Sequence, residues 1–329
     1  MGFVATAGTG AEFLIPNRSQ ADESKRLTDT MAASRSPEQT PADTWGADTR
    51  RYLRVFLTFA RNSLIRDMTF RADFLFHCIS SVAWTLMNVG FYLLVFRFTM
   101  MIGPDTGWGR DEFFLFLATV WFVNSLVQAF FIPNANEFSE LIRTGGLDFA
   151  LLKPIDTQFL ISFRRVEWSS LSNFVVGLLI AGISLHGLAT RAESPVYLTP
   201  LTLGLYVFFI ACGVAIMYSL MICLAATSVW LGRNQSLYDF WFYITNFSRY
   251  PMEIYNTPWG RPLLGLFTFV IPVLVVVNVP ARILARPLNP RADWEWQLAI
   301  WAVIATGLCL AASRWVFRQS LKSYRSASS

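Results

Sequence analysis

The chain has 329 residues, of which 54% are hydrophobic and 15% are charged, and its formal net charge is +5 at pH 7. A soluble protein of this length needs roughly a quarter of its residues charged to cover its surface. This composition therefore excludes soluble globular, disordered and disulfide-rich secreted proteins. Basic residues flank apolar runs instead of forming a patch with exposed aromatic residues, which excludes nucleic-acid binding and is typical of a membrane protein.

The N-terminal part of the chain contains two different segments. Residues 1–44 are rich in Ala, Thr, Ser and Pro without apolar periodicity, and predict a disordered leader ahead of a transmembrane domain over 45–329. Residues 50–67 predict an amphipathic helix with Arg51, Arg54 and Arg61 on one face. Because this helix is too charged to span a bilayer, we expect it to lie in the interface with its arginines among lipid phosphates.

The rest of the chain carries apolar segments long enough to cross a hydrocarbon core, which takes about 20 helical residues. They are residues 74–96, 113–132, 168–188, 201–226 and 298–317. Between the last two lie a short apolar segment, 237–247, and a longer one, 263–284, which is interrupted by Pro272 and Pro280. Proline at membrane depth frees backbone carbonyls that only protein or water can satisfy. The longer segment therefore predicts a broken or re-entrant helical hairpin, with a kinked full span as the alternative.

The distribution of Lys and Arg predicts the orientation of the spans. With the amphipathic helix in the cytoplasm, 15 basic residues fall on that side and eight on the other. This asymmetry favours six spans with both termini cytoplasmic.

The sequence offers little that could carry catalysis. His77 and His186 have no metal-ligand spacing to cysteine or carboxylate, and no phosphate-binding loop occurs. We therefore predict no catalytic, metal-binding or cofactor-binding residue in this chain. An ion-coupled transporter or channel would need an ionisable group deep in the bundle, for which Asp73, Asp239 and His77 are the candidates. Polar residues inside the spans could line a path or bond one helix to another, and we favour the bonding of helices; they are Asn88, Asn124, Gln128, Asn173 and Thr202.

The loop between the second and third spans is the most informative segment. Residues 134–144 predict a short helix with apolar residues on one side and charged residues on the other, and Gly145-Gly146 predicts its left-handed C-terminal cap. Such a helix would either dock a partner or connect two spans along the bilayer. The loop alone leaves both interpretations open.

Three segments together resemble a known family. They are LIRTGGLDFALLKPID after the second span, FSRYPMEIY at 247–255, and the paired prolines of FVIPVLVVVNVPARIL. Their order, together with the spans, resembles an ATP-binding-cassette (ABC) exporter permease, within a less-characterised branch of the type-2 exporter family. The resemblance covers residues 50–325.

The resemblance implies a coupling helix over 134–146 that seats in a cleft of a separate ATPase. The residues it assigns to this contact are Glu137, Phe138, Glu140, Leu141, Arg143, Gly145 and Gly146. It also implies a short fifth span over 236–252 and a re-entrant region over 253–296, with Pro251, Pro272 and Pro280 in and beside that region.

The resemblance further implies the partners. Two copies of an ABC ATPase subunit would associate with the permease. These subunits would bind ATP and Mg²⁺, and this chain would bind neither. A second permease, identical or homologous, would complete a dimer in the inner (cytoplasmic) membrane. The aromatic-rich spans suit an amphipathic or lipid-like cargo and suit contact with membrane lipid equally well.

Overall fold

The computed structural model describes residues 41–103, 106–191, 198–231, 242–243, 245–285 and 293–324. The chain divides into two units, Met1–Arg54 and Val55–Ser329. Of the predicted leader, only residues 41–44 are described, and they begin the first helix. The regular structure in the described residues is helical throughout, which confirms the all-α prediction.

The helices follow one another in a simple order. The long ones are α2 (Pro41–Thr69), α3 (Arg71–Phe98), α4 (Arg110–Phe130), α8 (Leu171–Ala189), α9 (Pro200–Ala226) and α14 (Asp293–Ser323). The shorter ones are α5 (Ile132–Arg143), α6 (Leu147–Leu151), α7 (Thr157–Phe163), α10 (Ser228–Leu231), α12 (Arg261–Gly265) and α13 (Val273–Ala285). Single turns occur at η1 (Trp168–Ser170), η2 (Met252–Tyr255) and η3 (Leu266–Val270).

Five of the described helices are long and apolar enough to cross a membrane. They are Arg71–Phe98, Arg110–Arg143, Trp168–Ala189, Pro200–Leu231 and Trp296–Ser323. Each contains one of the five predicted spans, so these predictions are confirmed. The predicted short fifth span, 236–252, lies partly outside the described residues.

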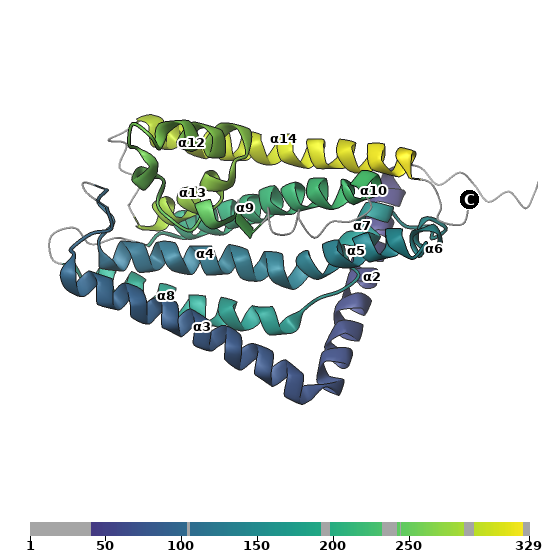
Figure 1. The fold of residues 1–329 in the computed structure, drawn as a ribbon, viewed down its shortest axis with the longest axis horizontal. Coiled ribbons are helices and arrows are strands. Elements are labelled where there is room, and N and C mark those ends of the chain that lie inside the picture. The colour runs from purple at the N-terminus through teal and green to yellow at the C-terminus, as the bar shows by residue number, and fades with distance from the viewer. Residues whose placement is uncertain are drawn as a thin grey trace, which may run out of the picture. The chain divides into compact units, whose positions relative to one another are not determined.

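Helix α4 forms the centre of the bundle. It packs against α8, α9 and α13, and α9 in turn packs against α13 and α14 (Figure 1). Most of α4 is buried, whereas α3 contacts mainly α8 and η1 and leaves most of its apolar side chains exposed. An exposed apolar helix of this length is stable only against lipid or another protein.

The region before the last span is sharply bent. The helical segment formed by α12 and η3 meets α13 at 88° across residues 271–272, so this region is either a broken span or a re-entrant loop. Pro272 lies at this break, as predicted for a broken hairpin. Pro280 does not break the chain, because it lies inside α13, so the expectation that both prolines interrupt the helix is wrong for Pro280.

The environment of Pro280 explains why α13 continues through it. Proline has no N–H, so it leaves the carbonyl of Val276 without its helical partner. That carbonyl faces Gly213 on α9, where a Cβ atom would lie only 2.7 Å from the Val276 oxygen. The absence of a side chain at Gly213 lets the two backbones approach closely enough for a weak Cα–H···O contact.

Helix α13 is fully buried and holds the FSRYPMEIY segment through polar contacts. The Asn278 side chain accepts a hydrogen bond from the Met252 amide at 2.9 Å, directly after Pro251. The buried Arg282 guanidinium pairs with Glu253 at 2.5 Å. A buried cation needs such a partner, which is why the charged and proline-containing segment folds back onto α13.

The substitution Gly213→Ala tests the contact between α9 and α13. The added methyl group would force the two helices apart, and we expect a loss of about 1–3 kcal/mol of stability. The detergent-solubilised protein is heated to a series of temperatures, and size-exclusion chromatography measures the fraction that remains folded. The change in the thermal midpoint gives the loss of stability. Gly204→Ala on the same helix is the control, since a Cβ there meets nothing within 4 Å. Equal stability of the two variants would contradict the contact.

Candidate functional site

Helices α5, α6 and α7 gather at one end of the bundle (Figure 1). Helix α5 follows α4 with only Phe131 between them, and Pro133 lies in its first turn, where proline is tolerated. The helix ends at Arg143, and Gly145 adopts a φ of 71°. The left-handed cap predicted at the glycine pair is therefore formed by Gly145.

The predicted charged contacts of this helix are already engaged within the chain. Glu137 pairs with Arg164, which follows α7, at 3.2 Å. Glu140 pairs with Arg143 one turn along α5, with N–O distances of 2.5 and 2.9 Å. The Glu140–Arg143 pair is exposed, so it is accessible to a partner, whereas Glu137 holds α5 against the end of α7.

The predicted apolar contacts point toward the bundle. Phe138 is buried, with its ring 5.8 Å from that of Phe317 on α14. Leu141 is half-buried and lies against Gly146, where a Cβ atom would come within 2.9 Å of the leucine side chain. These residues anchor α5 and close the turn into α6.

The outward apolar surface lies instead on α6 and the turn after it. Phe149 is 74% exposed and Leu152 is 81% exposed. Phe149 also borders a pocket of 260 Å³ between α5, α6 and α7. Neither residue was predicted from the sequence, because the local pattern does not distinguish an exposed apolar side chain from a buried one.

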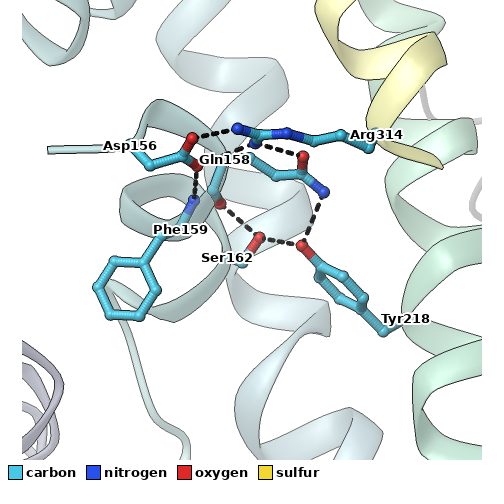
Figure 2. A network of polar contacts seen from close by, with 6 residues as sticks. All are labelled: Asp156, Gln158, Phe159, Ser162, Tyr218 and Arg314. Atoms are coloured by element: carbon cyan, nitrogen blue, oxygen red, sulfur yellow. Dashed lines mark hydrogen bonds and ion pairs between the residues drawn. The ribbon is translucent and has the colours of Figure 1, made fainter. Parts of the chain in front are cut away.

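A polar network ties α7 to the rest of the bundle, and Figure 2 shows its members. Asp156 caps α7 by accepting a hydrogen bond from the Phe159 amide at 3.0 Å. The Arg314 guanidinium on α14 donates to both carboxylate oxygens of Asp156. Arg314 also donates to the Gln158 side-chain oxygen at 2.8 Å. This bidentate arrangement is the strong form of a charge-assisted hydrogen bond.

The network continues from α7 to α9. The Gln158 side-chain amide donates to the Tyr218 hydroxyl at 3.0 Å. Ser162 donates to the Gln158 carbonyl at 2.6 Å and lies 2.8 Å from the Tyr218 hydroxyl. Because each hydroxyl has one hydrogen to give, the Tyr218 hydroxyl must donate to Ser162. The contacts run from α14 through α7 to α9.

The network also fixes a charge. The hydrogen bond from Arg314 holds the pKa of the Asp156 carboxyl below its ordinary value, despite the opposing effect of partial burial. Asp156 therefore stays ionised at neutral pH. The contribution of this ion pair to stability is present above the ordinary carboxyl pKa and is lost as the pH falls through the lowered value.

The remaining predicted residues lie elsewhere. Arg51, Arg54 and Arg61 are exposed on α2. From Phe56 onward α2 packs on the bundle, where the Ala60 carbonyl accepts a hydrogen bond from the Trp168 indole at 3.1 Å. Asp73 and His77 are exposed one turn apart on α3, with 3.6 Å between the Asp73 Oδ1 and His77 Nε2 atoms. Asp239 lies outside the described residues. No cluster of three potential metal ligands occurs in the part of the chain that the structure describes.

One family model, described as "ABC-2 family transporter protein", matches residues 82–328. The chain belongs to the ABC-2 transporter family. The match includes α5, α6, α7, the network of Figure 2 and the bent region of α12 and α13, and it begins within α3. No curated protein and no solved structure matches the chain. This chain is thus a membrane permease subunit of an ABC transporter.

Removal of the Arg314 charge tests the network. Arg314→Met would leave the Asp156 carboxylate without its cation, and we expect a loss of about 1–3 kcal/mol. The thermal midpoint measured at neutral pH should fall. Arg318→Met is the matched control, because Arg318 is exposed one turn further along the same helix. A midpoint that is unchanged in Arg314→Met would contradict a structural role for the ion pair.

Proposed function

We propose that this ABC-2 permease is the membrane half of an ATP-driven exporter and that α5 and α6 dock a separate ATPase subunit. The observation that carries the proposal is the surface around Phe149 and Leu152. Phe149 and Leu152 are 74% and 81% exposed and lie three residues apart. Neighbouring exposed apolar side chains with a polar rim are typical of a binding surface. The exposed Glu140–Arg143 pair lies on the preceding helix and would supply the polar rim of the interface.

The anchoring of α5 and α7 supports a role in transmitting movement. Phe138 packs on Phe317, and Asp156 pairs with Arg314, so both short helices are fixed to α14. Tyr218 extends the connection to α9. A displacement of α5 and α6 by a partner would therefore move the ends of two spans instead of being absorbed in a loop.

The cycle follows from differential binding. Two ATPase subunits that close on ATP would displace the α5–α6 surface, and this displacement would favour an outward-open arrangement of the spans. The ATPase would bind ATP and Mg²⁺, and this chain would supply no catalytic group. A second permease, identical or homologous, would complete the path across the inner membrane, with both termini and α5–α7 on the cytoplasmic side.

Affinity purification tests the proposal directly. The tagged full-length protein is solubilised gently from its own host, and the copurifying proteins are identified by mass spectrometry. We expect a protein with a phosphate-binding loop in near-stoichiometric amount. Recovery of this chain without an ATPase, repeated in nanodiscs, would contradict the proposal and favour a transporter that works without ATP.

The double variant Phe149→Asp/Leu152→Asp should lose the ATPase in the same experiment. Two carboxylates would replace the apolar centre of the interface, where a single truncation commonly costs about 2 kcal/mol or more. Trp259→Asp is the matched control, because Trp259 is 92% exposed but lies just before α12. Retention of the ATPase by the double variant would exclude this surface as the docking site.

A further inference from the structure

A second cavity, lined by other residues than the pocket at the α5–α7 end, lies along the spans. It measures 480 Å³ and lies between α3, α4, the start of α8 and residues 249–250. On α3 it extends from His77 to Tyr92, a length of about 22 Å at 1.5 Å per residue. This covers most of a hydrocarbon core of about 30 Å. Only two of its lining residues, Leu117 and Val120, are aliphatic.

One wall of this groove is used to bond helices together. The Asn173 side-chain amide donates to Ser81 at 2.6 Å, and Thr85 donates to Asn173 at 2.9 Å. These bonds join α3 to α8, as the sequence predicted for Asn173. Thr202 instead bonds back to Thr199 in the first turn of α9.

The α4 wall has one buried polar group that no described residue satisfies. Asn124, Ser125 and Gln128 line the groove within two turns of α4. Ser125 is 2% exposed, and its hydroxyl has no hydrogen-bonding partner among the described residues.

Other hydroxyls in the spans behave differently from Ser125. Those of Thr119, Ser219 and Thr306 each donate to the carbonyl four residues earlier in their helix. A buried hydroxyl without a partner costs free energy. The wall of the groove therefore contains a hydroxyl that no group among the described residues satisfies.

The chemistry of the lining restricts the ligand. The middle of the groove presents hydroxyl and amide side chains, which both donate and accept hydrogen bonds. The indole rings of Trp84 and Trp121 add broad apolar faces beside these groups. Charged or ionisable groups, His77, Glu167 and Arg249, occur toward the two ends. A neutral molecule rich in hydroxyl groups satisfies this lining, whereas an ionic headgroup would lack a counter-charge along the middle.

We propose that this groove binds the neutral, hydroxyl-rich part of the cargo, a saccharide or polyol headgroup, during export. The inference rests on the proposed function for its role in transport. A polar groove that crosses most of the bilayer gives such a group hydrogen bonds that lipid cannot offer. Any acyl chain attached to the group would remain in the lipid beside α3, whose apolar side chains are exposed.

Photolabelling of the full-length protein in phosphatidylcholine nanodiscs tests the proposal. One probe is a diglucosyl diacylglycerol with a photoreactive group on its sugar, and the other is phosphatidylcholine with the same group on its headgroup. We expect the glycolipid probe to label peptides of α3, α4 and 167–173 about tenfold more than the phosphatidylcholine probe does. Two additional hydrogen bonds of ordinary net strength would give an affinity ratio of about this size. The variant Asn124→Leu/Gln128→Leu should reduce this ratio to near one, and Ser219→Ala, outside the groove, should not.

The outcomes separate the possible sources of the ligand and the two proposals. Competition by soluble maltohexaose would indicate that a free saccharide chain binds, and competition only by unlabelled glycolipid would indicate a lipid-linked one; both support the groove. Equal labelling by the two probes, or a wild-type ratio in the double variant, would overturn it. If an ATPase copurifies and labelling is unselective, only the groove proposal fails. If labelling is selective and no ATPase copurifies, only the exporter proposal fails.

Discussion

The ion pair between Asp156 and Arg314 is the interaction on which the organisation of the α5–α7 end depends. The same carboxylate caps α7 and accepts both hydrogen bonds of a guanidinium on the last span. Without this carboxylate, α7 would lose its cap and the ion pair that connects it to α14 together, and Gln158 would be its remaining contact with Arg314. Phe138 against Phe317 adds an apolar contact between α5 and the same helix. The short helices are thereby part of the bundle, as the proposed transmission of movement to the spans requires.

Much of the fold could be predicted from the sequence because lipid imposes a simple requirement. A spanning helix must be about 20 apolar residues long, and each of the five segments predicted on this basis lies within one of the observed candidate spans. The glycine pair predicted where α5 ends, because only a residue without Cβ strain adopts a positive φ at low cost. Each of these signals depends on neighbouring residues alone, so it can be recognised in a single sequence.

The candidate site was harder to predict because its contacts join distant residues. Asp156 and Arg314 are 158 positions apart, and the sequence around either residue does not predict that it contacts the other. The inward orientation of Phe138 depends on where α14 ends, so its helix periodicity could not reveal it. The prediction that Pro280 interrupts the helix was wrong for the same reason. The glycine that lies against the carbonyl left unpaired by this proline belongs to a different helix, α9. The exposed Phe149 and Leu152 were identifiable only once burial was known.

The central claim is that α6 and the end of α14 move as one body when the ATPase closes. Spin labels at Leu152→Cys and Arg318→Cys, in a protein whose four native cysteines are replaced by serine, allow their separation to be measured by double electron–electron resonance. In the complex with the copurified ATPase, we expect the same distance without nucleotide and with ATP plus vanadate, while the distance from Leu152→Cys to Trp259→Cys changes. A nucleotide-dependent change between α6 and α14 would contradict it.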